Sequence, residues 1–176
     1  MRCPGCDRDL RGQKTTLEQP YQYVESGLDH VFLVGVILYA CQCGEELVEI
    51  PKVEQLDDVI AKVLIQKIDP LTGAEVRFLR KYAELPAKDF AKILGVSPEH
   101  LSRVENKKVQ RTGATYVLGA AADKLTRVIA HKASQDESIK EVLLTLAEAS
   151  EKKASRKTAR LFFEKRPRSS QWKIAA

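Results

Sequence analysis

Long apolar runs are scarce in this chain, which argues against a membrane protein. The longest run, from Val31 to Ala40, is about half as long as a helix that crosses a bilayer. The first ten residues, MRCPGCDRDL, contain no apolar core of the kind that a signal peptide needs. We therefore expect a cytoplasmic protein that does not bind membranes.

Histidines and catalytic motifs are also scarce, which argues against an enzyme. The three histidines, His30, His100 and His131, lie far apart in the sequence, and His30 fits a loop before a strand. The sequence has no Gly-rich phosphate loop and no His-Glu metalloprotease pattern. No combination of nucleophile, base and orienting group is visible, although distant residues can assemble one. We expect no catalytic residues.

Charge, by contrast, is abundant and segregated. Hydrophobic residues make up 44% of the 176 residues and charged ones 30%, which is typical of a soluble globular protein with one or two domains. Residues 71–132 carry a net charge of +6 and residues 152–176 of +8, whereas residues 1–70 carry −5 and residues 133–151 carry −4. This pattern predicts that only part of the chain faces a polyanion.

The four cysteines form two close pairs, Cys3-Pro-Gly-Cys6 and Cys41-Gln-Cys43. In a reducing cytoplasm, thiolates at such spacings favour tetrahedral Zn²⁺ over a disulfide framework. Four thiolates close the coordination sphere, so we expect the zinc to be structural. Two alternatives stay open: a thioredoxin-like redox pair, for which no preceding strand is visible, and buried free thiols.

The segment between the cysteine pairs is rich in β-branched and alternating residues. It predicts strands over 21–25, 31–39 and 47–50. So small a sheet has little core, and a metal would stabilise it directly. We therefore expect a zinc-binding β domain over residues 1–52. Residues 53–70 have apolar positions at helical spacing and predict a connecting helix that ends in a hinge.

Residues 71–132 contain three short amphipathic runs, which predict a helix-turn-helix domain. Thr72 and Glu75 form a capping box at the start of the first run, and Pro86 begins the second. Gly95 supplies the tight corner before the third run, which Ser97 caps. Such runs must pack on one another, because a short helix cannot bury its apolar stripe alone.

The third run has the pattern of a DNA-recognition helix. Its inward positions are Leu101 and Val104. Its outward positions at i, i+4 and i+7, together with two flanking residues, are Glu99, Arg103, Asn106, His100 and Lys107. This is the face that such a helix offers to a major groove.

Taken together, these motifs resemble the MqsA (YgiT) type of zinc-finger and helix-turn-helix antitoxins and regulators. The resemblance covers about residues 1–131. It is carried, in this order, by CPGC, YQYVESGLDHVFLVGV, CQCGEE, a proline-terminated strand, LTGAEVRFLRK and LGVSPEHLSRVE. It implies a homodimer that binds a palindromic operator in double-stranded DNA and represses its own operon. It also implies an N-terminal domain that neutralises an RNA-cleaving toxin.

The resemblance also implies roles for individual residues. The implied metal ligands are Cys3, Cys6, Cys41 and Cys43. Base contacts are implied for Glu99 and Arg103, and a phosphate contact for Ser102. The glutamine that often touches DNA in the second helix is absent here, and we expect Lys88 to reach a phosphate instead.

The proposed DNA contacts have plainer alternatives. Arg103 can pair with Glu99 one turn earlier, in a surface ion pair worth a few tenths of a kcal/mol. In the DNA interpretation its guanidinium binds guanine O6 and N7, which is worth about 1–3 kcal/mol of base discrimination. Glu99 and His100 can equally face water.

The rest of the chain suggests a dimer seam and a C-terminal extension. Residues 115–132 carry a wide apolar stripe, from which we select Leu118, Leu125 and Ile129 as candidate dimer contacts. Residues 133–176 predict a helical extension and a basic tail. Within that tail Arg166-Pro-Arg168 resembles arms that enter a minor groove, and a solvated tail is the alternative.

The sequence thus predicts an α+β protein, with a small zinc-binding β domain before an all-α helix-turn-helix (XRE/Cro-like) domain and a helical extension. We expect a DNA-binding transcriptional repressor that acts as the antitoxin of an RNase-type toxin. A stand-alone regulator with a structural zinc domain and no toxin partner is the alternative.

Overall fold

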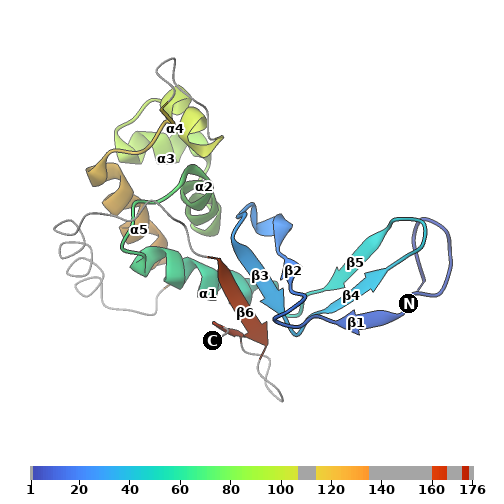
Figure 1. Ribbon diagram of the computed structural model, residues 1–176. Coiled ribbons are helices and arrows are strands. Elements are labelled where there is room, and N and C mark those ends of the chain that lie inside the picture. The colour runs from blue at the N-terminus through green and yellow to red at the C-terminus, as the bar shows by residue number, and fades with distance from the viewer. Residues whose placement is uncertain (1, 107–113, 135–159, 166–171, 175–176) are drawn as a thin grey trace. The chain divides into compact units, whose positions relative to one another are not determined.

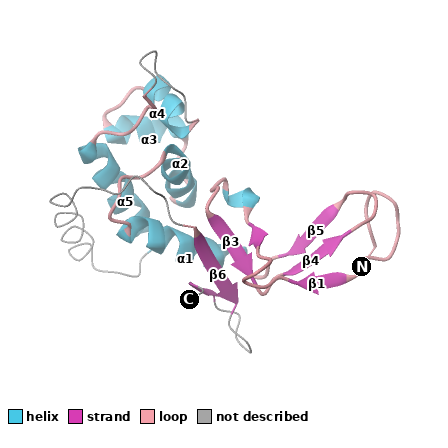
Figure 2. Ribbon diagram, viewed as in Figure 1, coloured by secondary structure: helices cyan, strands magenta, loops and turns pink. Residues whose placement is uncertain are grey.

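The computed structural model describes residues 2–106, 114–134, 160–165 and 172–174. The chain forms two compact units: a β unit made of residues 1–56 and 159–176, and a helical unit made of residues 57–158. Figure 2 shows strands in the first and helices in the second. The predicted α+β class is confirmed, with the cysteine pairs in the β unit.

The β unit contains two small sheets. The first has the order β1-β4-β5, is antiparallel throughout, and consists of β1 (Gly12–Lys14), β4 (Ile37–Ala40) and β5 (Glu46–Glu49). The second has the order β2-β3-β6-β7 and consists of β2 (Tyr21–Gln22), β3 (Val31–Val34), β6 (Leu161–Lys165) and β7 (Trp172–Ile174). A 3₁₀ turn, η1 (Val24–Ser26), follows β2.

The single long strand predicted over 31–39 is wrong, because the chain breaks into β3 and β4 and passes from one sheet to the other. The break lies at Gly35, whose φ of 84° is accessible to glycine at little cost. Thr15 holds the corner: its hydroxyl donates to the carbonyls of Leu33 and Val36, and its backbone bonds Gly35 and Val36. The uninterrupted apolar run hides this corner in the sequence.

The C-terminal segment returns to the β unit (Figure 1). Strand β6 pairs in parallel with β3, with Leu33 opposite Phe163, and Val31, Leu33 and Phe163 are fully buried. The predicted helical extension lies mostly outside the described residues, as does Arg166-Pro-Arg168. Of its described parts, residues 133–134 end α5 and residues 161–165 and 172–174 are strands. The strands form because the apolar residues of β6 complete the core that β3 begins.

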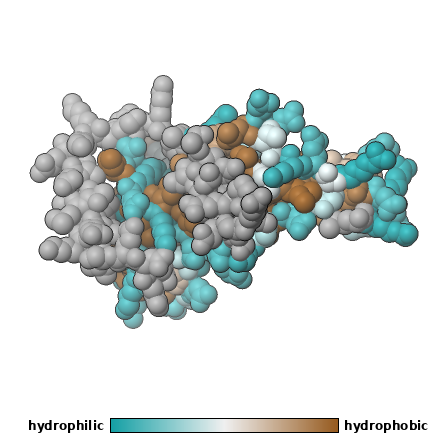
Figure 3. Space-filling view, turned by 90° about the horizontal axis from the view of Figure 1, so that it is seen from below, coloured by the Kyte–Doolittle hydropathy of each residue, from teal (hydrophilic) through white to brown (hydrophobic). Residues whose placement is uncertain are grey.

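The described helices are α1 (Val53–Gln66), α2 (Gly73–Tyr82), α3 (Ala87–Leu94), α4 (Pro98–Glu105) and α5 (Ala120–Ser134). All of them belong to the helical unit except the first residues of α1, up to Leu56, which count with the β unit. Within the described parts of the chain, none of the helices has the length and apolar character needed to cross a membrane. On the face in Figure 3, hydrophobic residues lie in separate groups between hydrophilic ones.

Local capping signals place α2, α3 and α4 where the sequence predicts them. Thr72 accepts a hydrogen bond from the Glu75 amide, and the Glu75 carboxylate accepts one from the Thr72 amide at 2.7 Å, so the predicted capping box is confirmed. Gly95 ends α3 in the left-handed conformation. The Ser97 hydroxyl accepts from the His100 amide at 3.1 Å and starts α4.

The three helices of the predicted helix-turn-helix share one apolar core. The residues that fill it are Val76 and Leu79 of α2, Phe90, Ala91 and Leu94 of α3, and Leu101 and Val104 of α4, all of which are buried. Each large side chain among them contributes about 1.5–3 kcal/mol by leaving water. Helix α4 is thereby oriented with one face inward and the other in solvent, and Figure 1 shows it next to α3.

A buried arginine on α5 holds the segment that connects α1 to α2. Arg127 bonds Asp123 at 2.8 Å and donates to four carbonyls at the end of α1 and just beyond it, those of Leu64, Ile65, Lys67 and Asp69. The Asp123 carboxylate also accepts from the Leu71 amide at 2.7 Å. The segment that we predicted as a hinge is therefore tied to α5.

Candidate metal centre and nucleic-acid interface

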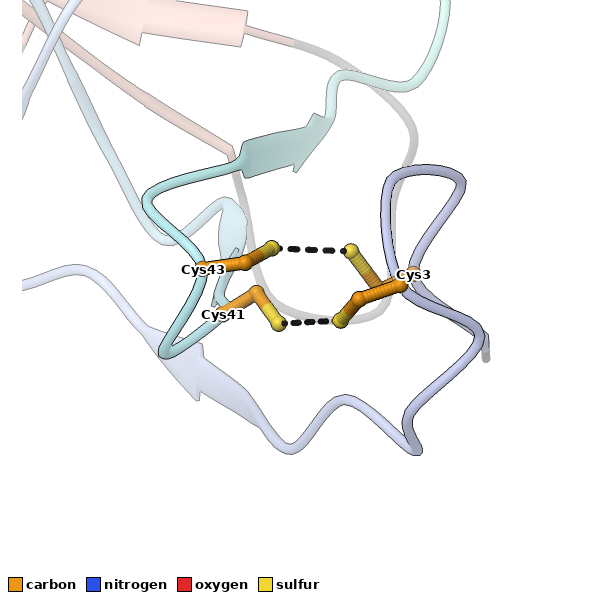
Figure 4. Close-up of side chains that lie close together, drawn as sticks. Cys3, Cys41 and Cys43 are labelled. Carbon is orange, nitrogen blue, oxygen red and sulfur yellow. Dashed lines mark hydrogen bonds between the residues drawn. The ribbon is translucent and has the colours of Figure 1, made fainter.

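The four cysteines gather at one end of the first sheet. Their sulfur atoms all lie within 4.8 Å of one another. Two close approaches join the two pairs: Cys3 Sγ lies 3.5 Å from Cys43 Sγ, and Cys6 Sγ lies 3.4 Å from Cys41 Sγ. Figure 4 shows these sulfurs facing one another across the gap between the two loops. The predicted cysteine cluster is confirmed.

Backbone hydrogen bonds shape the two loops that present the sulfurs. In the first loop, the Asp7 amide donates to the Cys3 carbonyl, and the Cys3 amide donates to Arg8. In the second, the amides of Cys41 and Gly44 close a tight turn by bonding Glu45 and Cys41 respectively. These turns direct the cysteine side chains of both pairs toward a common point.

The donor set fits a tetrahedral metal. A bond between Zn²⁺ and sulfur of about 2.3 Å requires neighbouring sulfurs about 3.8 Å apart, close to the distances found here. A disulfide needs about 2.0 Å, and none of the four cysteines is in a disulfide. Cys3 is buried, Cys43 is exposed and the other two are half-buried. The cluster can therefore hold a metal ion such as zinc, with all four positions filled by sulfur.

Gly5, in the first loop, lies beside the second loop. A Cβ at this position would lie 3.0 Å from Cγ of Glu45 and 3.8 Å from the sulfur of Cys43. The Arg8 guanidinium donates to the Gln42 side chain at 3.2 Å, which joins the first loop to the second. The loops are thus close enough to share one ion.

The second candidate site is the solvent-facing side of α4. Glu99, Ser102, Arg103 and Asn106 are exposed and His100 is half-buried, as the helical spacing predicts. Asn106 ends the helix, where its amide group donates to the Ser102 carbonyl at 2.7 Å. Lys88 lies exposed on α3, and Lys107 falls outside the described residues.

Two acidic residues of α4 differ in environment. The Glu99 carboxyl is fully exposed, and its pKa is lowered by hydrogen bonds from its own amide and the Ser97 hydroxyl and by the charge of Arg103. Glu99 is therefore ionised at neutral pH and can only accept hydrogen bonds. Glu105 instead forms a double hydrogen bond with Arg80 of α2, at 2.7 and 2.9 Å. That bond raises the pKa of Arg80 and fixes the end of α4.

Arg103 contacts a residue that the sequence did not single out. Its Nη1 donates to the Tyr116 hydroxyl at 3.5 Å, and its guanidinium carbon lies 5.4 Å from the centre of that ring. His100 meets the same ring edge to face at 5.9 Å. Within the described residues no ion pair joins Arg103 to Glu99, the alternative partner that its position one turn later suggests.

The three candidate dimer residues differ in exposure. Leu118 is buried within the helical unit, with 9% of its surface accessible, whereas Leu125 is 36% exposed. Ile129 is half-buried. Only the last two therefore offer appreciable apolar surface to another molecule.

Comparisons of this chain with protein-family models, with curated proteins and with solved structures find no match. What the molecule does is therefore inferred from the chemistry of these residues.

Proposed function

We propose that this protein is a sequence-specific regulator that binds double-stranded DNA through α4. The observation that carries this proposal is the two-sided character of α4. Leu101 and Val104 are fully buried against the neighbouring helices, while Arg103 and its exposed neighbours face solvent. In helix-turn-helix proteins the residues near the start of the second helix contact base edges in the major groove.

Charge and symmetry extend the proposal. Residues 71–132 carry 12 basic and 6 acidic residues, which suits a polyanionic partner. Helix-turn-helix proteins commonly bind as dimers to two half-sites, and Leu125 and Ile129 supply exposed apolar surface for such contact. We propose a homodimer on a palindromic operator, and repression as its effect.

The test of DNA recognition replaces Arg103. Arg103→Ala should remove the preference for the protein's own promoter and leave weak, salt-sensitive binding to any duplex, because phosphate contacts carry no sequence information. Competition binding with promoter and unrelated duplexes measures this preference. Lys132→Ala, an exposed cation on α5, is the matched control and should keep it. Retained preference in Arg103→Ala contradicts the assignment.

We also propose that the cysteine cluster holds one structural Zn²⁺ that braces the β unit. Cys41→Ser should lose the metal and loosen this unit, because three thiolates bind zinc more weakly than four. Metal content by atomic spectroscopy and backbone order by hydrogen exchange measure the two effects. Gln42→Ser, which leaves all four ligands in place, should retain about one zinc per chain.

Two outcomes would count against this assignment. Full metal content in Cys41→Ser would exclude a four-thiolate site. Loss of helix throughout the chain would show that the helical unit depends on the β unit, contrary to the compact division of the structure.

A protein partner for the β unit is the second candidate function. The resemblance to MqsA-type antitoxins suggests an RNase-type toxin, and the charge of β5 favours a basic partner. Strand β5 is at the edge of its sheet, and Glu45, Glu46 and Glu49 are exposed on or beside it. Edge strands accept strands from other chains, and acidic side chains attract basic partners.

Co-expression tests this candidate. The full chain is produced together with the product of an adjoining reading frame that encodes a small basic protein. The two should co-purify, and Glu46→Lys with Glu49→Lys should abolish the complex, whereas Glu18→Lys, an exposed acid outside both sheets, should not. If no adjoining reading frame encodes such a protein, or if its product does not bind, the result favours a stand-alone regulator.

A further inference from the structure

Tyr116 lies against the exposed face of α4 although it belongs to the segment that leads into α5. Its hydroxyl accepts a hydrogen bond from Arg103 Nη1 at 3.5 Å, and its ring lies under the same guanidinium at 5.4 Å. The His100 ring meets it at 5.9 Å with an angle of 77° between the ring planes. One aromatic side chain thus contacts two residues expected at the DNA.

These contacts restrict the rotamers of the Arg103 side chain before DNA binds. A free arginine on a helix surface samples many rotamers, and ordering it on binding lowers affinity. The attraction between the cation and the ring, together with the hydroxyl bond, orders it beforehand. The carboxylate of Glu99, the competing partner one turn away, is instead engaged with its own amide and Ser97.

The geometry also leaves the reading groups available. A guanidinium has five N–H donors, and the contact with Tyr116 uses Nη1. Nε and Nη2 remain for the paired acceptors O6 and N7 of a guanine, the commonest specific contact in the major groove. Tyr116 therefore orients Arg103 without occupying the edge that reads a base.

We propose that Tyr116 is a specificity-determining positioning residue, which holds Arg103 in the orientation that reads one base pair. This proposal rests on the proposed function, sequence-specific DNA binding through α4. It predicts that Tyr116 acts on one position of the operator, the position that Arg103 reads, and that its effect disappears when Arg103 is absent.

The experiment uses the full chain and a duplex selected from random DNA by the wild-type protein. Affinities at one salt concentration are measured by fluorescence anisotropy for this duplex and for a series in which one base pair is replaced at a time. The variants are Tyr116→Phe, Tyr116→Ala, Arg103→Ala and the double variant Arg103→Ala/Tyr116→Ala. Val117→Ala, at an exposed neighbouring position, is the matched control.

Tyr116→Ala should lose about tenfold of the discrimination at the base pair that Arg103 reads and less than about twofold elsewhere. Tyr116→Phe, which keeps the ring and loses the hydroxyl, should lose a smaller part at the same position. In the Arg103→Ala background, Tyr116→Ala should change nothing further, since coupled residues are not additive. Val117→Ala should match the wild type.

Four outcomes overturn the proposal. If Tyr116→Ala weakens binding to every duplex equally, Tyr116 has a phosphate contact or a general structural role. If Tyr116→Ala has the same effect in the Arg103→Ala background, Tyr116 acts independently of Arg103. Unchanged discrimination in both Tyr116 variants, beside intact wild-type preference, overturns the positioning role alone. Absence of preference in the wild type itself overturns the proposed function and this role together. Circular dichroism shows whether Tyr116→Ala folds. If it does not, the discrimination measured for Tyr116→Phe still tests the positioning role.

Discussion

At the scale of single residues, Gly73 shows how closely α2 and α4 approach. It is the first residue of α2, and a Cβ there would lie 1.8 Å from the carbonyl oxygen of Val104. The obstacle is backbone rather than a flexible side chain, so one helix would have to move. The position therefore admits only glycine without a shift in the helix that carries the candidate DNA contacts.

Gly73→Ala should lower the free energy of unfolding of the helical unit by about 2 kcal/mol. Alanine gains up to about 1 kcal/mol of helix propensity, but overpacking of this kind costs about 1–3 kcal/mol and more where backbone must shift. Urea denaturation followed by circular dichroism measures the difference. Gly119→Ala, where a Cβ meets nothing within 4 Å, should change it by less than about 1 kcal/mol. Equal effects at both glycines would contradict the close approach.

At the scale of elements, α5 organises the helical unit through Arg127. The guanidinium is almost fully buried, pairs with Asp123 and satisfies carbonyls at the end of α1 that no helical amide can reach. Its positive charge also interacts favourably with the partial negative charge of that helix end. One side chain thus joins α5 to the α1 terminus and to the start of the segment that precedes α2.

Arg127→Met should lower the free energy of unfolding by about 3–5 kcal/mol, because it leaves the buried Asp123 carboxylate without its cation and removes a donor from the carbonyls at the end of α1 and just beyond it. Thermal or urea unfolding of the full chain measures the loss. Lys132→Met on the same helix is the control, since Lys132 is exposed, and its effect should stay within about 0.5 kcal/mol. A loss below about 1 kcal/mol for Arg127→Met would mean that water replaces the guanidinium.

At the scale of the whole molecule, the chain leaves the β unit, builds the helical unit and returns to complete the sheet that it began. Strand β6 supplies Phe163 opposite Leu33 of β3, and both side chains are fully buried. The returning segment also changes the charge of the β unit. Residues 1–56 carry 5 basic and 9 acidic residues, whereas residues 159–176 carry 5 and 1, so the two parts together are neutral.

Phe163→Ala should destabilise the β unit by about 3–5 kcal/mol, because it removes a fully buried aromatic ring from the shared core. Phe162→Ala, at the neighbouring half-buried position that stacks on Phe32 at 5.3 Å, should cost clearly less. Hydrogen exchange of the β3 amides measures both effects and separates them from the helical unit. Equal protection in wild type and Phe163→Ala would show that β6 is not needed to hold β3.

Much of the helical unit was predictable because its signals are local. The capping box of Thr72 and Glu75, the left-handed Gly95 and the Ser97 cap each act within one turn of chain, and the structure has them where the sequence indicates. The corner at Gly35 was not predictable in this way. It depends on Thr15, which lies in another strand-forming segment and reaches it only in the folded chain.

The candidate sites divide in the same manner. The sequence alone determined the two cysteine pairs and the outward positions of α4, because ligand spacing and helical period are properties of short segments. Only the tertiary structure decided that four sulfurs meet within 4.8 Å, that β6 pairs with β3, and that Tyr116 rather than Glu99 contacts Arg103. These contacts join residues distant along the chain, and the packing of the whole unit selects them, whatever the local preferences of each segment.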